Sequence, residues 1–424
     1  GSELNLNGFT LTLGNTVRSS GTLVFEGTGS AITDTDLDSG TVEYRGSAAF
    51  NTGTDGWGSN TYYNLIVNTS GDLTAAAGIT VDGALSVQSG QFNLNGQTIN
   101  VSGDISSDVT TPFAGSGTVQ IAAGATSDTT GTINFNNLTI GTGATLNLGG
   151  DISISGNLVN NGTLNTNGHT VTFDGTTTVS GNSIDFGSVL IDAGSSMTLS
   201  VDIGVKGDWT NDGTFTHGNF MVEFLAGSGP STISGDSTFD ELRCVAPGKS
   251  IVFESGSTQT VDTLTLKGSS VSLISLTSSS FDTFTINNGA GVDDVDYVSV
   301  SDSDVLSNDI NAGFNSVEGS NVDTTSPGWV FQRDVYVWTG NGGDGNWSTL
   351  NNWSRTSGSP VTSSPGLVDW VSIPGGKSSY PSVTSSITVK SLSIGPGGEF
   401  TVDSGGSMTT TYLNNDGTVT VSGT

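Results

Sequence analysis

The stretch FNNLTI at residues 135–140 decides the fold, because close variants of it recur along the chain. Each copy has an aromatic or β-branched residue, two polar positions, and then two apolar positions on either side of a polar one. Apolar residues spaced two apart indicate short β-strands with one buried face. The other copies are YYNLIV (62–67), FGSVLI (186–191), FDELRC (239–244), VDTLTL (261–266), FDTFTI (281–286) and VKSLSI (389–394).

A second pattern follows many of these copies: Gly, a short strand, Asn or Asp with Gly, and another strand. Examples are GQFNLNGQTINVSGD (90–104), GTLNTNGHTVTFDG (162–175) and GTFTHGNFMVEFLAG (213–227). Asn and Gly tolerate the positive φ that a sharp bend requires. The first-pattern copies that start at 135, 186 and 239 are 51 and 53 residues apart. This spacing predicts two turns of a coil with roughly 25 residues each.

One such turn cannot bury its apolar residues alone, but stacked turns bury a continuous core and pair every main-chain group. We therefore predict an all-β chain that folds as a parallel β-helix, that is, a rod-like β-solenoid with short strands and Asn-, Gly- and Ser-rich turns. The alternative is a string of immunoglobulin-like sandwiches. Sandwich strands are longer, and their turns are less frequent than those of this chain.

Composition excludes some partners. The 424 residues carry a formal net charge of −30, from 40 acidic and 10 basic side chains. The basic residues are scattered singly, so we expect no nucleic-acid partner and no attraction to an anionic membrane. No apolar run approaches the roughly 20 residues of a membrane span, so we expect no membrane insertion. The single Cys244 allows no internal disulfide, and its alternating apolar position predicts a buried, inert thiol.

The repeat rhythm breaks once, at 295–331, and resumes at VKSLSI. Four of the seven Trp residues fall shortly after the break. We predict three segments: a β-solenoid module over 1–332 that ends at GWVF, a Trp-rich opening segment over 333–372, and the start of a second solenoid stretch over 373–424.

Two motifs near this break carry a family resemblance. WTGNGGDGNWSTLNNW (338–353) and GWVF (328–331) resemble segments that open and close modules in giant repetitive bacterial surface proteins, similar to filamentous haemagglutinin and autotransporter passengers. The resemblance covers the whole chain in style but only 295–372 in motif. It implies a right-handed coil, an extracellular location on the bacterial cell surface, and a structural role in an adhesin, fibre or filament.

The Trp-rich segment allows two interpretations. Trp338, Trp347 and Trp353 could cover the open end of the solenoid core, whose strand edges are otherwise unpaired. Alternatively, they could form a stacking platform for the sugar rings of surface glycans.

Two acidic clusters are candidate Ca²⁺ sites, although no cofactor is required by the sequence. Asp34, Asp36 and Asp38 have the one-three-five spacing of a calcium loop. The loop departs from the EF-hand pattern, because Arg45 stands where the bidentate Glu belongs. The second cluster consists of Asp293, Asp294 and Asp296.

Catalytic motifs are not found. His169 and His217 both lie beside turn glycines, and no nucleophile elbow or phosphate-binding loop is present. We therefore predict a non-enzymatic protein. Two alternatives stay open: a carbohydrate-active lyase or glycosidase, which needs only suitably placed side chains on the same fold, and a binding module for glycans or Ca²⁺.

The two ends of the sequence complement each other. LNNDGTVTVSGT (413–424) followed by GSELNLNGFTLTLG (1–14) reads as one unbroken repeat. In the order 335–424 and then 1–334, the chain would run from the Trp-rich opener to GWVF as one module. The spacing across this junction matches an internal copy only if Gly1 and Ser2 are not native. We predict tandem copies or head-to-tail self-association. The expected interface residues are Leu4, Leu6, Phe9, Leu11, Leu413, Val419 and Val421.

Overall fold

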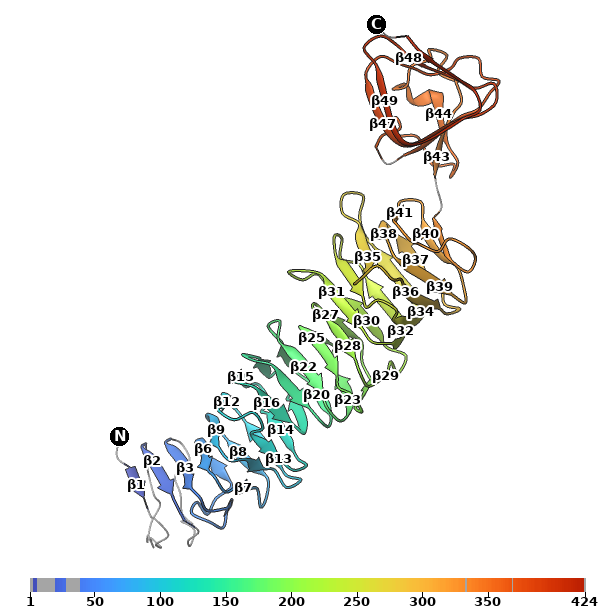
Figure 1. Ribbon diagram of the computed structural model, residues 1–424. Helices are drawn as coiled ribbons and strands as arrows, with labels where there is room; N and C mark the ends of the chain where they lie inside the picture. Colours follow the sequence, from blue (N-terminus) through green and yellow to red (C-terminus); the bar gives the residue numbers. More distant parts are fainter. Residues whose placement is uncertain (1–2, 6–19, 28–38, 332–333, 368, 423–424) are drawn as a thin grey trace. The chain divides into compact units, whose positions relative to one another are not determined.

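The structure, a computed structural model, describes residues 3–5, 20–27, 39–331, 334–367 and 369–422. In these ranges the regular structure is β-strand apart from one 3-10 helix, η1 (Leu350–Asn352). The strands pair in parallel from one turn to the next and form a β-solenoid of about 19 turns, as the succession of strands in Figure 1 shows. The predicted β-solenoid is confirmed, and the immunoglobulin-like alternative is wrong.

Two nine-stranded sheets begin the coil. The first contains β1 (Glu3–Asn5), β2 (Thr22–Phe25), β3 (Thr41–Gly46), β6 (Asn64–Thr69), β9 (Leu85–Ser89), β12 (Ile105–Ser107), β15 (Thr126–Thr130), β18 (Thr145–Asn147) and β21 (Thr163–Asn165). The second contains β5 (Thr61–Tyr62), β8 (Ile79–Val81), β11 (Thr98–Val101), β14 (Thr118–Ile121), β17 (Asn137–Ile140), β20 (Leu158–Asn160), β23 (Thr176–Gly181), β26 (Ser196–Leu199) and β29 (Thr214–Thr216).

Three further sheets complete the sides of this coil. A four-stranded sheet has β4 (Phe50–Asn51), β7 (Leu73–Thr74), β10 (Phe92–Asn93) and β13 (Phe113–Ala114). A ten-stranded sheet has β16 (Ile133–Phe135), β19 (Ile152–Ile154), β22 (Thr170–Phe173), β25 (Ser188–Ile191), β28 (Trp209–Asn211), β31 (Ser231–Ser234), β33 (Ser250–Phe253), β35 (Ile274–Ser278), β38 (Val298–Val300) and β41 (Val317–Glu318). An eight-stranded sheet has β24 (Ile184–Phe186), β27 (Ile203–Val205), β30 (Met221–Phe224), β32 (Ser237–Cys244), β34 (Thr258–Lys267), β36 (Phe284–Asn288), β39 (Ser303–Leu306) and, paired to β34, β37 (Asp294–Asp296).

The remaining strands form three small sheets. The first pairs β40 (Ile310–Gly313) with β42 (Trp329–Phe331). The second runs in the order β44 (Trp353–Arg355), β43 (Val335–Trp338), β45 (Trp370–Ile373), β47 (Ser386–Ile394) and β49 (Ser407–Asn415). The third has β46 (Ser382–Val383), β48 (Glu399–Val402) and β50 (Thr418–Val421).

The chain divides into two compact units, Gly1–Asn311 with Val317–Val330, and Ala312–Ser316 with Phe331–Thr424. The sequence-based boundary lies at 332. The Trp-rich segment and the solenoid stretch that follows it share the five-stranded sheet, so both belong to the second unit. In Figure 1 the coil of this unit, drawn in red, is seen nearly end-on and has three sides.

The predicted turn length of roughly 25 residues lies within the range that the turns span. Residues paired in adjacent turns are 18 apart for Val171 with Val189 but 27 apart for Gln259 with Ile286. Motif spacing does not give a single turn length, because equivalent motifs do not stack on one another. Phe135 is in register with Ile154 of the next turn, and Phe186 lies in a different sheet.

The recurrent motif marks a corner of the coil and not a fixed side. In FNNLTI, Phe135 ends β16 and the two apolar residues after it lie in β17. In FGSVLI, Phe186 ends β24 and its two apolar residues lie in β25. From β16 to β24 the chain passes eight strands, which is two and two-thirds turns of a three-sided coil.

Each unit has its own core of stacked, inward-facing apolar side chains. Strands such as β17 and β25 alternate between half-buried and fully buried positions, as the sequence pattern predicts. Phe253 and Phe284, from adjacent turns, stack with their ring centroids 4.1 Å apart. Cys244 is buried, as predicted, and burial raises the pKa of its thiol. In the described residues no helix is long and apolar enough to cross a membrane.

Candidate functional site

The first predicted calcium cluster, Asp34, Asp36 and Asp38, lies outside the described residues. The second cluster is described, and its three carboxylates have different partners. Asp293 accepts hydrogen bonds from the Leu264 main-chain N–H at 3.0 Å and the Asn288 amide at 2.8 Å. Burial raises the pKa of Asp293.

Asp294 and Asp296 lie on either side of the buried Val295 in β37. Asp294 forms an ion pair with Lys267, and Asp296 accepts a hydrogen bond from the main-chain N–H of the next residue at 3.0 Å. Within the described residues no group of three or more His, Cys, Asp or Glu side chains is arranged to hold a metal ion. Calcium binding therefore stays a prediction.

The three Trp residues of the opening segment form the core of the second unit. Trp353 packs edge-on against Trp338 and Trp347, with ring centroids 4.8 and 4.7 Å away. Their relative exposures are 0% for Trp338, 2% for Trp347 and 4% for Trp353. Each indole N–H donates to a main-chain oxygen, of Ser379, Pro365 and Trp347 respectively. Stacking on a sugar needs an exposed ring face, which none of these three rings presents in this arrangement.

The same segment ends the five-stranded sheet of the second unit. β44 pairs with β43 in antiparallel fashion, with Trp353 opposite Trp338, and is the first strand of that sheet. All later pairs in the sheet are parallel. An antiparallel edge strand does not continue a parallel ladder, so the parallel pairing of this sheet ends at β43.

The predicted interface residues fall into two groups. At the start of the chain, the main chain of Leu4 in β1 pairs in register with Leu23 of β2, whereas Leu6, Phe9 and Leu11 lie outside the described residues. At the other end, the side chains of three predicted interface residues are exposed, at 59% for Leu413, 36% for Val419 and 71% for Val421.

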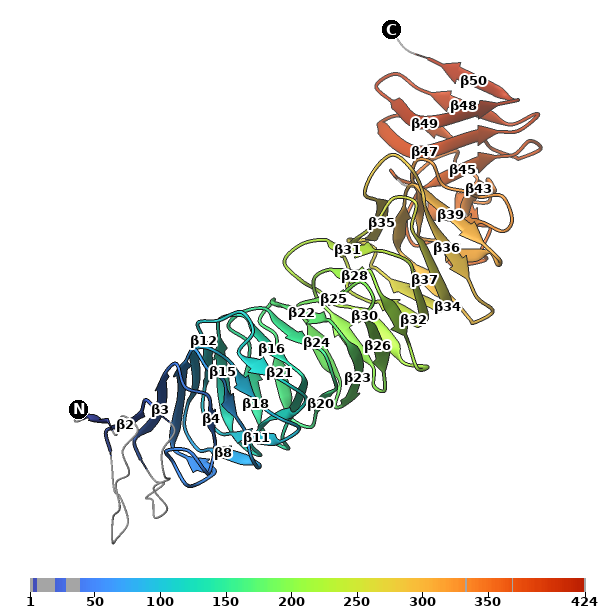
Figure 2. The same cartoon turned by 60° about the horizontal axis from the view of Figure 1, so that its bottom comes forward.

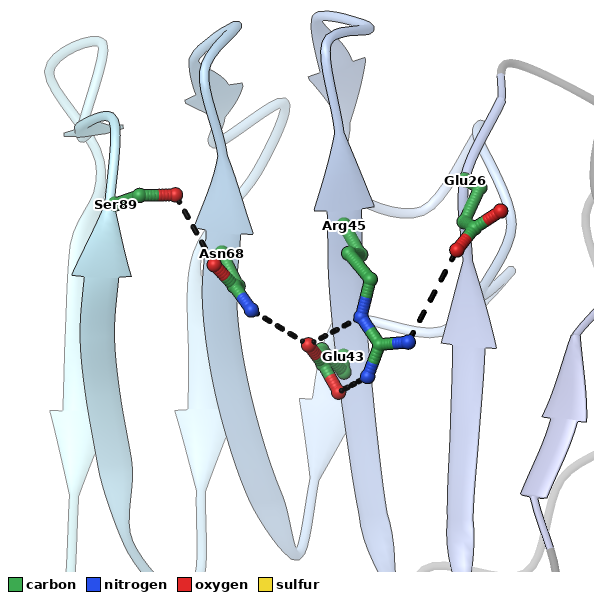
Figure 3. Close-up of polar contacts among 5 residues, drawn as sticks. All are labelled: Glu26, Glu43, Arg45, Asn68 and Ser89. Atoms are coloured by element: carbon green, nitrogen blue, oxygen red, sulfur yellow. Dashed lines mark hydrogen bonds and ion pairs between the residues drawn. The ribbon is translucent and has the colours of Figure 1, made fainter.

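A polar network that the sequence analysis did not predict crosses four adjacent strands of the first unit (Figure 3). Glu43 in β3 is only 6% exposed although it lies on the outer side of its strand. Arg45, two residues later on the same strand, donates to both Glu43 carboxylate oxygens at 2.9 Å. Asn68 of β6 donates to Glu43 Oε1 at 2.9 Å, and Ser89 of β9 donates to Asn68 Oδ1 at 3.1 Å.

These contacts determine the charge of Glu43. Burial raises the pKa of the carboxyl, but hydrogen bonds from Arg45 and Asn68, together with the charge of Arg45, outweigh it and hold the pKa below its usual value. Arg45 Nη1 also lies 3.9 Å from Glu26 Oε1, beyond the end of β2. An ionised carboxylate that is held by three donors is suited to joining adjacent turns and not to donating a proton.

A second network repeats this arrangement further along the coil. Glu241 and Arg243 of β32 are again two residues apart on the outer side of one strand. Arg243 Nε donates to Glu223 Oε1 of β30 at 3.3 Å, and Thr265 of β34 donates to Glu241 Oε1 at 2.9 Å. The sequence signal is Glu-x-Arg at two positions, EYR (43–45) and ELR (241–243), each inside an alternating strand pattern.

The two histidines lie beside turns. The His169 main-chain N–H donates to the Thr166 carbonyl at 2.9 Å, and its Nδ1 lies 3.5 Å from Asp151. His217 Nδ1 accepts from the main-chain N–H of Asn219 at 3.1 Å. Both rings are occupied with local contacts.

Comparisons with known proteins give no identity. No family model matches the chain, and no curated protein and no solved structure matches it either.

Proposed function

We propose that this chain is a non-enzymatic, extracellular structural protein, a β-solenoid unit of a bacterial surface adhesin, fibre or filament. In this proposal the units extend as tandem copies in one chain or by head-to-tail stacking, and in the second case the contact is made by a second copy of the chain. The proposal rests on one observation, the exposed continuation of the core at the edge formed by β49 and β50, the last strands of their sheets.

The residues exposed at this edge continue columns of the core. Leu413 is in register with Leu392, which is 2% exposed, and Val419 is in register with Phe400, which is 1% exposed. Leu413 and Val419 are themselves exposed, because no described strand lies over β49 or β50 (Figure 2). An unpaired strand edge with apolar residues is a template for pairing with another strand.

The opposite edge of the same sheet is covered by the antiparallel β44, so a parallel ladder can continue only from β49. The complementary surface in this proposal is β1 of another copy, which is the first strand of its own sheet. Such a contact joins two different surfaces, so it propagates into a filament and does not close into a dimer.

The experiment compares the 424-residue chain with two single variants by sedimentation velocity over a range of concentrations and by electron microscopy. We expect end-to-end association of the wild-type chain and its loss in Leu413→Lys, which places a charge in the contact. The control is Val271→Lys, because Val271 is 93% exposed and lies outside the strands. A wild-type chain that stays monomeric, or a Leu413→Lys variant that associates like the wild type, would contradict head-to-tail stacking and leave tandem copies as the mode of extension.

An extracellular location is supported by the resemblance of the opening and closing motifs to those of bacterial surface proteins. The test is antibody labelling of intact source cells, compared with permeabilised cells. Labelling only after permeabilisation would contradict this part of the proposal.

A further inference from the structure

One side of the solenoid in the first unit is interrupted between two successive turns. The first sheet ends at β21, and the strand on this side in the next turn, β24, begins the eight-stranded sheet. Figure 2 labels both strands in the middle of the coil. A hollow of about 530 Å³ lies here, lined in part by Asn160, Leu164, Asn165, Thr166, Asp185 and Lys206. This volume is typical of small-molecule sites, which are roughly 300–1,000 Å³.

A ladder of side-chain amides leads to this hollow and stops at its rim. Asn147 of β18 donates to Asp128 Oδ1 at 2.7 Å, and Asn165 of β21 donates to Asn147 Oδ1 at 2.7 Å. Each side-chain amide N–H in the ladder therefore donates to a residue of the preceding turn. Asn165 Oδ1, at the end, accepts no hydrogen bond from the described residues.

The residue across the interruption is another acceptor. Asp185 of β24 is the outward residue of its strand, and its side chain is 54% exposed. An amide oxygen and a carboxylate cannot bond to each other, so the ladder cannot continue from Asn165 to Asp185 without a donor between them.

The main chain adds one acceptor and one donor at the interruption. In a parallel ladder alternate residues direct their main-chain groups to opposite neighbours. Thr163 and Asn165 bond towards the preceding turn, through Ala144 and Leu148. Leu164 thus directs its carbonyl and N–H towards the interruption, where β21 has no ladder partner among the described strands.

One cationic donor is present at the hollow. Lys206 Nζ lies 3.2 Å from Asp185 Oδ2. Gly204 of β27 is in register with Asp185, and a side chain at Gly204 would collide with Asp185 and Leu225. A ligand here must donate to Asn165 Oδ1, the Leu164 carbonyl and Asp185, and must also accept from the Leu164 N–H and Lys206. A hydroxyl group does both, whereas a metal cation or an amine would face the Lys206 charge.

We propose that this hollow binds a neutral saccharide, with vicinal hydroxyls bridging Asn165 Oδ1 and the Asp185 carboxylate. The site is separate from the edge that the proposed function uses, so its loss leaves head-to-tail association unchanged. Because no aromatic ring is among the described lining residues, the affinity rests on hydrogen bonds alone and is expected to be about millimolar.

The test is saturation-transfer NMR on the full chain with cellobiose, maltose, lactose and N,N′-diacetylchitobiose, followed by titration of the sugar that gives the largest signal. We expect at least one sugar to bind and Asn165→Ala and Asp185→Ala to weaken it about tenfold each. The matched control is Asn100→Ala, which removes an outward Asn side chain from β11, away from the ladder and the hollow, and it is expected to bind as the wild type does.

The outcomes separate the alternatives. No saturation transfer from any of the four sugars at about 20 mM would overturn the proposal. So would wild-type affinity in both Asn165→Ala and Asp185→Ala, once circular dichroism shows that they are folded. Equal loss in Asn100→Ala would also overturn it, because the effect would then not be specific to the hollow. If the wild-type chain binds Ca²⁺ but none of the sugars, and Asp185→Ala abolishes the Ca²⁺ binding, the ligand of the hollow is a cation and not a saccharide.

Discussion

At the scale of single residues, Glu43 shows why charged side chains persist in a solenoid that is otherwise built from small polar groups. Its strand neighbour Arg45 reaches both of its oxygens, and Asn68 ties the pair to the next turn. Glu43 is the buried member of this pair, whereas the Arg45 side chain is 37% exposed, so losing the Glu43 charge costs charge-assisted hydrogen bonds and does not leave a buried cation unpaired.

Glu43→Gln is expected to destabilise β3 and β6 by about 2 kcal/mol, because a charge-assisted hydrogen-bond pair is lost while Arg45 stays in place. Hydrogen exchange of the β3 and β6 peptides measures this local free energy, which a global melting curve of a repeat protein averages out. Glu26→Gln is the control. Its 3.9 Å contact to Arg45 is half-exposed and is expected to contribute less than about 1 kcal/mol. Equal effects of the two variants would contradict this prediction.

The same pair predicts a pH dependence. The folded-state pKa of Glu43 lies below the ordinary value of 4.5, so the stabilisation is fully present above that pH and is lost as the pH falls through the folded-state pKa. The difference in protection between the wild-type chain and Glu43→Gln should therefore shrink on acidification from pH 5 to about pH 3. A difference that stays constant over this range would mean that Arg45 does not act through the charge of Glu43.

Trp347 contributes to the stability of the second unit through packing and not through charge. Its ring contacts Trp353 and Phe400, and its exposure is 2%. Trp347→Ala should destabilise the second unit by about 4 kcal/mol through the cavity that it leaves, as measured by denaturant unfolding followed by Trp fluorescence. Trp370→Ala serves as the control, because Trp370 is half-buried and stacks on the exposed Tyr412, and its loss is expected to be about half as large. A smaller effect at Trp347 than at Trp370 would contradict this account.

At the scale of elements, the corners between strands limit what the sequence can vary. Gly90, directly after β9, has φ of +69°, and a side chain there would collide with the Thr69 carbonyl of the preceding turn. Stacked turns are about 4.8 Å apart, so neither main chain can move away. Gly124 has a similar φ of +73° but open space around it.

Gly90→Ala and Gly124→Ala therefore separate crowding from backbone conformation. Gly124→Ala is expected to cost about 1 kcal/mol, the penalty of a left-handed conformation alone, and Gly90→Ala about 3 kcal/mol or more. Thermal unfolding with hydrogen exchange at the flanking strands provides the comparison. Equal losses in the two variants would show that the turn spacing can relax.

The corners also explain how far sequence reasoning reaches. Strands and core residues such as Leu138 and Ile140 could be predicted, because alternation of apolar residues is a local property. The turn length could not be predicted from motif spacing, since the same motif occupies different corners and its repeats are not whole turns. The hollow beside β21 could not be predicted either, because it depends on which strands fail to pair across turns.

The candidate sites show the same limit: residue types and spacing can be read from the sequence, but burial and partners cannot. The clustering of Trp338, Trp347 and Trp353 is visible in the sequence, but their burial, which bears on whether they form a core or a sugar platform, depends on tertiary contacts. In the sequence, Arg45 stands out only because it replaces the Glu of a calcium loop. In the structure its partner is Glu43, two residues earlier on the same strand. Glu-x-Arg on the outer side of a strand is the signal that would have found this network, and it recurs at Glu241 and Arg243.

At the scale of the whole molecule, the net charge of −30 opposes association of one copy with another. Screening weakens this repulsion, since the Debye length falls from about 10 Å at 0.1 M salt to about 3 Å at 1 M. The proposed contact at Leu413 and Val419 is apolar. Salt should therefore leave the hydrophobic attraction intact while reducing the electrostatic repulsion between copies.

We therefore predict that raising NaCl from about 0.02 M to about 0.5 M strengthens head-to-tail association of the wild-type chain about tenfold or more, as measured by sedimentation velocity. Leu413→Lys should stay monomeric throughout, and Val271→Lys, which changes the net charge equally, should follow the wild type. Association that weakens with salt would instead indicate pairing of opposite charges and would contradict an apolar contact. A comparison of CaCl₂ with NaCl at the same ionic strength separates general screening from binding at the calcium site predicted at Asp34, Asp36 and Asp38. Only specific binding would make association in CaCl₂ differ from association in NaCl.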